Sequence, residues 1–352
     1  MKVLSIVGAR PQFVKLAPID HALRAAGVEH VIVHTGQHYD ERMSGEFFSE
    51  LDISAPDVNL NVGSAGHGAQ TGAMLGLLDD VHTSHDPDWV LVYGDTNSTL
   101  AGAVSAAKLH YPLAHLEAGL RSFNRRMPEE HNRVLTDHAA DLLLAPTTEA
   151  MRHLAAEGLA ERSTLVGDVM TDVLFDVRAR QASGQVTSPD LGFAAGEYYL
   201  STIHRAENTD DPERLRAVVE GLQALDKPVV LLAHPRLVSR CADHGIDLAA
   251  GAIELRDPMK YPDLVAAAAE AAAIVTDSGG LQKEAFLLRT PCVTVRTETE
   301  WVETVALGWN ALAADPTTIG STLRGLSTEP TDAAPYGDGQ AAGRVVEALR
   351  GT

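Results

Sequence analysis

The segment Ala273-Ile274-Val275-Thr276-Asp277-Ser278-Gly279-Gly280-Leu281-Gln282 decides how this chain folds. Its first residues form a short apolar run, which predicts a buried strand. Ser278, Gly279 and Gly280 then open a helical segment. Glycines let a phosphate approach the free N–H groups at a helix start, where the helix dipole favours negative charge. The segment therefore predicts a strand–turn–helix unit that can hold a phosphate; an ordinary glycine-rich turn is the alternative interpretation.

Apolar runs of strand length alternate with amphipathic segments along nearly the whole chain. Continuous apolar runs indicate strands buried on both faces, as in parallel sheets, and the amphipathic segments supply crossover helices. The predicted strands are residues 3–7, 30–34, 89–93, 113–116, 142–145, 164–166, 198–203, 229–233, 252–255, 273–276 and 292–295. The predicted helices are residues 13–26, 98–110, 148–157, 212–225 and 280–289. This order predicts an α/β fold with two doubly wound parallel sheets.

The length of the chain points to two domains. Single cores stop growing at roughly 250–300 residues, and this chain has 352. Ser, Gly, Pro and Asp collect in residues 182–196 without a helical or strand period. We therefore predict an N-terminal domain at residues 1–182 and a C-terminal domain at residues 183–339. The amphipathic helix at residues 340–352 is predicted to pack back onto the first domain.

Composition excludes several classes of function. The formal net charge is −20, whereas nucleic acids and anionic membranes attract clustered Lys and Arg, so neither is an expected partner. The cysteines, Cys241 and Cys292, lack metal-ligand spacing, so no metal site is expected. No apolar run approaches the roughly 20 residues of a membrane span, and the N-terminus does not have the pattern of a signal peptide, so a cytoplasmic protein is expected.

Charged side chains follow several predicted strands of the first domain, at the edge where open α/β folds bind ligands. Arg10 and Lys15 follow the first strand and suit an anion, and the absence of G-x-G-x-x-G argues against a dinucleotide cofactor. Asp95, Glu117 and Glu129 are candidate acid/base residues, and Arg133 is a candidate for substrate binding. Structural alternatives exist for each carboxylate. They are capping of the next helix for Asp95, pairing with Arg121 for Glu117, and a favourable helix start for Glu129.

The second predicted domain carries a basic group at the ends of its strands. His204 and Arg205 follow one strand and His234 follows the next. These residues are candidates for phosphate contacts, although a single histidine at a strand end is more often structural. Glu284 lies one helical turn after Gly280 and can accept hydrogen bonds from ribose hydroxyls.

Together these motifs resemble those of the non-hydrolysing UDP-N-acetylglucosamine 2-epimerases. The matching motifs, in chain order, are Gly8-Ala9-Arg10-Pro11, Tyr93-Gly94-Asp95-Thr96-Asn97-Ser98, His115-Leu116-Glu117-Ala118-Gly119-Leu120-Arg121, Pro128-Glu129-Glu130-His131-Asn132-Arg133, His204-Arg205-Ala206-Glu207-Asn208 and Asp277-Ser278-Gly279-Gly280-Leu281-Gln282. The resemblance implies a GT-B-like pair of Rossmann-like domains with a UDP-sugar in the cleft, and a homodimer.

The resemblance also implies roles for individual residues. It places Asp95, Glu117 and Glu129 in the acid/base role and His204 near the diphosphate. It places Glu284 at the ribose. It places four residues at the phosphates: Arg10, Ser278, Gly279 and Gly280.

The chain departs from the family pattern at several positions. Many members have Thr and Glu where this chain has Ala9 and Gln12, and Glu where it has Lys283. Some bacterial members bind a second, activating substrate molecule at a site that Gln37, Gln70, Arg205 and His234 match. Ala69 replaces an arginine of that site, which argues against allosteric activation here.

The resemblance implies inversion at C2 of UDP-N-acetylglucosamine to give UDP-N-acetylmannosamine. The C2 proton is a very weak acid, so the consistent route is elimination of UDP to a 2-acetamidoglucal followed by re-addition. Three alternatives are a hydrolysing 2-epimerase that releases N-acetylmannosamine, a GT-B glycosyltransferase and a non-catalytic UDP-sugar sensor. Three carboxylates on one edge favour chemistry at C2, because a transferase needs at most one base.

Overall fold

The structure, a computed structural model, describes residues 1–37 and 53–351, and of Arg10 it describes the backbone only. It forms two units, Met1–Phe175 with Ala334–Thr352 and Asp176–Ala333. The chain passes from the first unit to the second inside helix α7 (Val169–Ala182). The predicted domain boundary at residue 182 lies after this division between the units. The reason is that the Ser- and Gly-rich residues on which the prediction rests follow the end of α7.

Unit 1 contains a parallel sheet in the order β3-β2-β1-β4-β5-β6-β7. Its strands are β1 (Lys2–Val7), β2 (Glu29–His34), β3 (Val58–Asn59), β4 (Trp89–Tyr93), β5 (Leu113–Leu116), β6 (Leu142–Ala145) and β7 (Ser163–Leu165). The order reverses direction between β1 and β4, which is where ligands bind in doubly wound folds. The ends of β1 and β4 are therefore the first place to look for a site.

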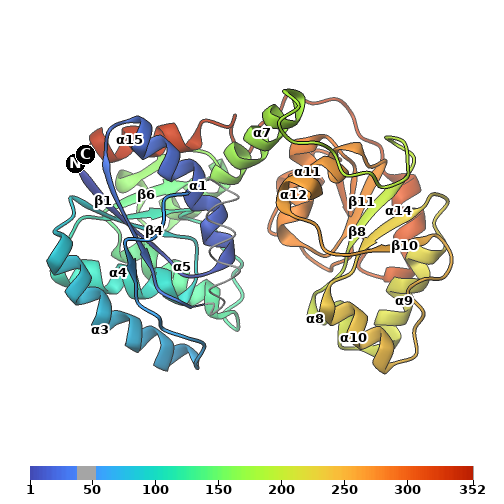
Figure 1. Ribbon diagram of the computed structural model, residues 1–352, viewed down its shortest axis with the longest axis horizontal. Coiled ribbons are helices and arrows are strands. Elements are labelled where there is room, and N and C mark those ends of the chain that lie inside the picture. The colour runs from blue at the N-terminus through green and yellow to red at the C-terminus, as the bar shows by residue number, and fades with distance from the viewer. Residues whose placement is uncertain (38–52, 352) are drawn as a thin grey trace. The chain divides into compact units, whose positions relative to one another are not determined.

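Helices cover both faces of this sheet (Figure 1). One face packs against α1 (Arg10–Ala25) and α15 (Ala341–Gly351), and the other against α3 (His67–His85), α4 (Asn97–Leu109) and α6 (Thr148–Ala156). Helix α5 (Pro128–Ala139) packs beside α4. The indole of Trp89 donates to the carbonyl of Leu349 at 3.0 Å, which anchors α15 to the start of β4.

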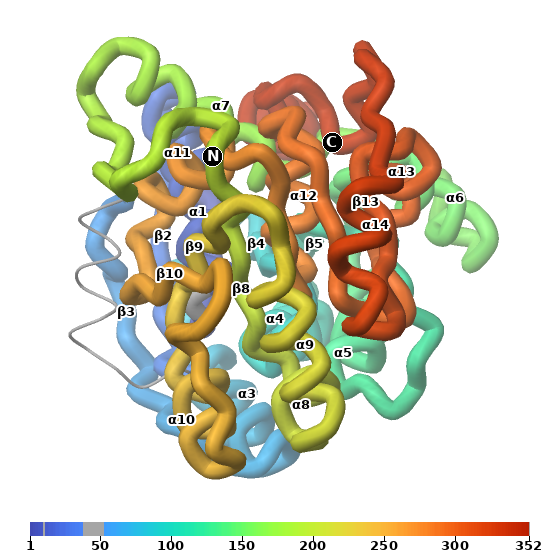
Figure 2. The backbone as a smooth tube through the Cα atoms, turned by 90° about the vertical axis from the view of Figure 1, so that its right-hand side faces the viewer, coloured from blue at the N-terminus to red at the C-terminus, as the bar shows by residue number. Residues whose placement is uncertain are grey.

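Unit 2 contains a second parallel sheet in the order β10-β9-β8-β11-β12-β13. Figure 2 labels β8, β9, β10 and β13 of this sheet on the backbone trace. Its strands are β8 (Tyr199–Thr202), β9 (Val229–Leu232), β10 (Ile253–Arg256), β11 (Ala273–Thr276), β12 (Cys292–Thr294) and β13 (Asn310–Leu312). Its helices are α8 (Ala206–Thr209), α9 (Pro212–Gln223), α10 (Pro235–Asp243), α11 (Tyr261–Glu270), α12 (Gly279–Leu288), α13 (Val302–Ala306) and α14 (Ile319–Gly325). The two sheets confirm the predicted α/β class with two doubly wound units.

The sequence analysis missed several elements, of which α3 and β13 show the reasons best. Helix α3 contains Gly68, Gly72 and Gly76, and each glycine costs about 1 kcal/mol relative to alanine in a helix. Packing against α4 compensates for that weak local preference. Strand β13 has only three residues, and the apolar run that begins in it is mostly alanine, which is depleted in strands; its pairing with β12 at the sheet edge defines it.

Candidate functional site

Asp95 and Glu117 follow the neighbouring strands β4 and β5 at the carboxyl edge of the first sheet. Thr96, not Asp95, caps helix α4, because its hydroxyl accepts from the Thr99 N–H. The capping alternative for Asp95 is therefore wrong. Glu117 has a φ of 74°, and a non-glycine residue in this region stores on the order of 1 kcal/mol of strain. Its N–H donates to the Leu144 carbonyl at 3.1 Å, which helps to hold the strained turn.

Lys15 of helix α1 donates a hydrogen bond to the carboxylate of Glu117. Both side chains are largely buried. Burial opposes the charged form of Lys15, but Glu117 and then Asp95 outweigh it and raise the pKa of the amine above its usual value. A Cβ placed on Gly94 would lie 3.1 Å from Glu117 Oε2 and 3.5 Å from Lys15 Nζ, so the turn before Asp95 adjoins the pair. Arg121 is not the partner of Glu117, because it pairs with Asp137 and Glu157.

Helix α5 brings two further acidic residues and a cation to this edge. Arg133 donates to the carboxylate of Asp95, with its Nε 3.2 Å from Oδ2, and also binds Glu130 at 2.9 Å. Burial opposes the charge of Glu130, yet bonds from the Ser122–Phe123 backbone and Arg133 lower its pKa. Glu129 is half-buried and makes no ion pair within residues 1–37 and 53–351. Asp95 is thus held by a cation, whereas no cation among the described side chains holds Glu129.

Gln12 connects the first and fourth strands, a role that the sequence analysis did not assign. Its carbonyl oxygen accepts from the N–H groups of Gly8 and Ala9 at 2.8 and 3.0 Å. Its amide donates to the carbonyl of Tyr93 at 2.8 Å. Gln12 therefore fixes the turn after β1 against the end of β4, and a glutamate at this position could not donate when ionised.

A buried carboxylate, Asp277, organises the candidate phosphate site in unit 2. It follows β11, is 0% exposed, and accepts from the N–H groups of His204 and Arg205 at 3.1 and 2.9 Å. It also accepts from the Asn208 amide at 3.0 Å. The sequence analysis did not select Asp277; the signal was an acidic residue directly after a buried strand, where a charge requires partners.

The basic residues of unit 2 lie on the loops after β8 and β9. Burial is the main cause that lowers the pKa of His204, with Asp277 opposing and His234 reinforcing the shift. The His204 and His234 rings lie 5.3 Å apart between centroids. His234 Nδ1 accepts from the Arg236 N–H at 3.2 Å and so caps α10. His234 thus has a structural role, while His204, Arg205 and the α12 start meet around Asp277.

Ser278, Gly279 and Gly280 form the start of α12. The Ser278 hydroxyl accepts from the Leu281 N–H at 3.3 Å. A Cβ on Gly279 would lie 2.6 Å from Glu300 Oε1, whereas a Cβ on Gly280 would meet nothing described within 4 Å. Glu300 also binds Arg296 at 2.8 Å and lies 3.9 Å from Arg205. A protein carboxylate therefore lies beside the helix start at which a phosphate is predicted.

Glu284 and Lys283 occupy the next turn of α12. Glu284 accepts from the Tyr261 hydroxyl at 3.0 Å and is 7% exposed. The Lys283 ammonium lies 4.4 Å from the centroid of the Trp301 ring. This cation–π contact places a buried lysine where many family members have glutamate.

Other expected site residues have defined partners or lie outside the description. Gln37 accepts from the N–H and hydroxyl of Ser98 at 3.0 and 2.7 Å. Gln70 binds Asn97 at 2.8 Å, and Ala69 is exposed on α3. The side chain of Arg10 lies outside the described residues, so its predicted phosphate contact stays a prediction.

Two cavities lie at opposite edges of the first sheet. One, of about 590 Å³, is at the carboxyl edge and includes Asn97, Arg125, Arg126, His131 and Asn132 in its lining. The Asn132 amide donates to the Asp95 carbonyl at 2.9 Å, so this cavity adjoins the candidate carboxylates.

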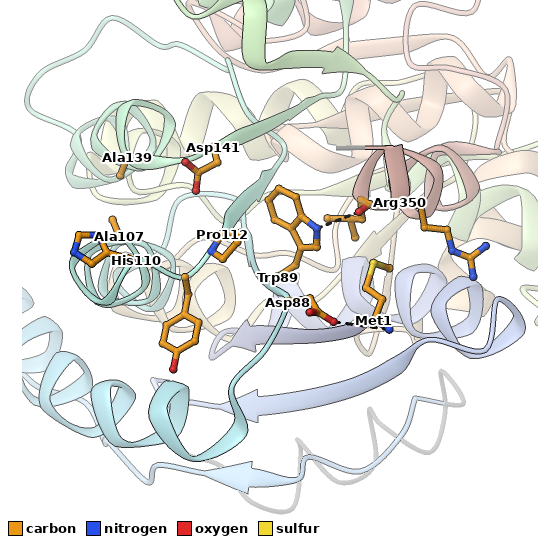
Figure 3. A pocket seen from close by; sticks show the side chains of 11 residues that line it. Met1, Asp88, Trp89, Ala107, His110, Pro112, Ala139, Asp141 and Arg350 are labelled. Atoms are coloured by element: carbon orange, nitrogen blue, oxygen red, sulfur yellow. Dashed lines mark hydrogen bonds and ion pairs between the residues drawn. The ribbon is translucent and has the colours of Figure 1, made fainter.

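The other cavity, of about 1010 Å³, lies at the amino edge of the sheet (Figure 3). Trp89 at the start of β4 and Asp141 just before β6 line it, together with Met1 and Arg350 near the chain ends. It is remote from the strand ends that carry the candidate carboxylates, so we do not assign the reaction to it.

Within the described residues, no group of three or more His, Cys, Asp or Glu side chains could hold a metal ion. No helix among those residues is long and apolar enough to cross a membrane.

Comparison with known proteins shows which family the chain resembles over its length. A family model described as UDP-N-acetylglucosamine 2-epimerase matches residues 21–350. The UDP-2,3-diacetamido-2,3-dideoxy-D-glucuronate 2-epimerase of Pseudomonas aeruginosa is 46% identical, with 99% of each chain covered. The UDP-N-acetylglucosamine 2-epimerase of Methanocaldococcus jannaschii is 40% identical over 99% of each chain. Its crystal structure with UDP-GlcNAc and UDP covers 100% of both chains at 39% identity, with a TM-score of 0.84.

Proposed function

Because the chain belongs to the UDP-N-acetylglucosamine 2-epimerase family and is an isomerase, we propose that it inverts C2 of UDP-N-acetylglucosamine without hydrolysis. The product is UDP-N-acetylmannosamine. The observation that carries the proposal is the group of acidic residues at one sheet edge: Asp95 held by Arg133, Glu117 held by Lys15, and Glu129, which pairs with no cation among the described side chains.

The reaction proceeds by elimination and re-addition. A carboxylate takes the C2 proton, the C1–O bond breaks, and UDP departs with the electron pair of that bond, which leaves a 2-acetamidoglucal. UDP oxygen then attacks C1 while C2 receives a proton on its opposite face. The two faces of C2 require different acid/base groups, and a set of separately positioned carboxylates can supply them.

The carboxylates differ in how firmly they are held. Cations fix Glu117 and Asp95, so these residues keep their places before substrate binds. Glu129 lies in the first turn of α5, on the same helix face as Arg133 four residues later. We assign the two held carboxylates to proton transfer at C2. We assign Glu129 to a contact with the sugar that forms only when the substrate binds.

Unit 2 supplies the groups for the UDP moiety. The N–H groups at the start of α12 and the Ser278 hydroxyl suit the diphosphate, because the helix dipole favours negative charge there. Arg205 and His204 add donors, which stabilise the charge on departing UDP. Glu284 accepts from the ribose hydroxyls in this assignment.

Incubation with UDP-N-acetylglucosamine in D2O, without added cofactor, tests the proposal. We expect deuterium at C2 in both epimers with UDP still attached, detected by NMR and mass spectrometry. Free N-acetylmannosamine would identify a hydrolysing enzyme. A C2 proton that never exchanges would exclude both kinds of epimerase and favour a transferase or a sensor. The variants Asp95→Asn, Glu117→Gln and Glu129→Gln, assayed for C2 exchange, then separate the roles of the carboxylates.

One observation favours a second candidate substrate, a UDP-linked diacetamido hexuronate like that in the name of the Pseudomonas relative. The carboxyl-edge cavity is lined by Arg125, Arg126 and His131, and no carboxylate is among its described lining residues, in a strongly acidic chain. Such a lining suits an anionic sugar substituent. We expect Arg125→Ala to raise KM for the hexuronate and leave KM for UDP-N-acetylglucosamine unchanged, if the cavity receives that group. Equal effects on both substrates would contradict this.

A further inference from the structure

A buried chain of charged side chains adjoins the turns that carry Asp95 and Glu117. His115 of β5 and Asp137 of α5 have fully buried side chains. His115 Nδ1 lies 2.6 Å from Asp137 Oδ1, and its Nε2 lies 2.7 Å from the carbonyl oxygen of Gly94. The other oxygen of Asp137 accepts from the Gly119 N–H at 3.1 Å.

These contacts define the protonation state of His115. A backbone carbonyl can only accept, so Nε2 must carry a proton. Burial raises the pKa of Asp137, but His115 and Arg121 outweigh it and lower that pKa below the usual value. The ionised Asp137 also only accepts, so Nδ1 carries a proton as well. The two contacts therefore suit an imidazolium at His115, with a proton on each ring nitrogen.

Charged groups continue outward from Asp137. Arg121 lies 2.7 Å from Asp137 Oδ2 and binds Glu157 through two bonds of 2.8 Å. An imidazolium makes the His115–Asp137–Arg121–Glu157 chain neutral. The outer end of this chain is open to solvent, because Glu157 is 28% exposed and its Oε2 lies 3.1 Å from Nε2 of His138. The two buried contacts of His115, rather than the charge count, therefore carry its assignment.

Asp137 connects the three elements that carry the candidate carboxylates. It holds the Glu117 turn through Gly119, and the Asp95 turn through His115 and the Gly94 carbonyl. Asp137 also lies on the face of α5 that carries Glu129 and Arg133, since residues four apart share a helix face.

We propose that His115 and Asp137 are positioning residues, an imidazolium–carboxylate pair that sets the spacing of the acid/base groups. The inference rests on the proposed C2 chemistry and assigns the pair no contact with substrate. Reacting groups lose about 100-fold in rate when displaced by roughly 1 Å. Asp137→Asn should therefore lower kcat on the order of 100-fold and leave KM and the Kd for UDP within about twofold.

A matched control is Asp20→Asn. Asp20 is also fully buried and bonds a histidine, with its Oδ1 2.8 Å from His30 Nδ1, but it holds neither carboxylate turn. Both variants should lower the Tm, and only Asp137→Asn should lower kcat. Equal effects of the two variants on kcat would show that Asp137 acts through general stability alone and would overturn the proposal.

Histidine ring ¹⁵N NMR tests the charge state without an activity assay. At neutral pH the wild-type protein should show a signal from a histidine with both ring nitrogens protonated that is absent from the spectrum of His115→Gln. A His115 signal with one bare nitrogen would overturn the imidazolium. This measurement stands even where Asp137→Asn does not fold. Absence of C2 exchange by the wild-type protein would contradict the proposed function and leave the NMR result to decide the charge.

Discussion

The ammonium of Lys15 binds the carboxylate of Glu117, a residue 102 positions later in the chain. Helix α1 supplies the cation and the turn after β5 supplies the anion. The side chains are 15% and 12% exposed, so water screens the pair little. This relationship joins two sequence motifs into one local site.

Lys15→Met leaves Glu117 as an uncompensated charge in a mostly buried place. Removal of one partner from such a pair costs on the order of 3 kcal/mol. We expect that loss in the free energy of unfolding, measured with urea at neutral pH, together with a large fall in C2 exchange. The double variant Lys15→Met/Glu117→Gln is the control and should recover stability but not activity. An unchanged stability of Lys15→Met would contradict this.

The same pair predicts an alkaline dependence of stability. The pKa of Lys15 is raised in the folded protein, by Glu117 and Asp95 against the effect of burial. The folded state therefore holds this proton more tightly than the unfolded chain does. The contribution of this amine to the free energy of unfolding is complete below its pKa in the unfolded chain. It is lost as the pH rises through its pKa in the folded protein. Urea unfolding from neutral to strongly alkaline pH should show this decline in the wild type and a smaller decline in Lys15→Met.

Asp20 predicts an acid-side dependence. Burial opposes its charge, but His30 and Ser54 lower its pKa to about 2. The Asp20 carboxylate contributes about 2 kcal/mol to the free energy of unfolding at pH values above its pKa in the unfolded chain. This contribution is lost as the pH falls through its pKa in the folded protein. Asp20→Asn should flatten the decline in stability between pH ~4 and ~2, measured by urea unfolding. An equally steep decline in the variant would count against this assignment.

Gly279 and Gly280 form a matched pair at the start of α12. Gly279→Ala places a Cβ 2.6 Å from Oε1 of Glu300, so that carboxylate must move, whereas Gly280→Ala meets nothing described within 4 Å. We expect Gly280→Ala to hold or raise the Tm, because alanine favours a helix, and Gly279→Ala to raise it less, because the displaced carboxylate weakens its pair with Arg296. Calorimetric titration with UDP should show weaker binding for both variants. Unchanged UDP affinity in Gly280→Ala would place the phosphate elsewhere.

In the proposed UDP site, Glu300 would compete with the diphosphate for the same cations. It binds Arg296 at 2.8 Å and lies 3.9 Å from Arg205, beside the α12 start. Glu300→Gln removes that negative charge and should tighten UDP binding several-fold, most at low ionic strength, where screening is weakest. The control is Glu303→Gln, a neighbouring acidic residue in the first turn of α13. Weaker binding by Glu300→Gln would indicate that Glu300 helps to hold the ligand.

Local sequence identified the elements that form through a simple apolar pattern. The runs at β4 (Trp89–Tyr93) and β11 (Ala273–Thr276) are strands with the predicted bounds. The predicted family, α/β class and isomerase activity are likewise confirmed. Helix α3 escaped prediction because its glycines weaken the local helical signal, and its stability comes from contacts with α4.

The sequence by itself determined which chemical groups stand at the strand ends, because a residue that directly follows a buried parallel strand lies at the carboxyl edge. Only the tertiary structure decided their partners. Glu117 meets Lys15 and not Arg121, and Asp95 meets Arg133 and not the N–H groups of α4. Asp277 binds the loop that carries Arg205, a residue 72 positions earlier in the chain. Such pairings depend on the order of strands in the sheet, which brings distant segments together, and no local pattern encodes them.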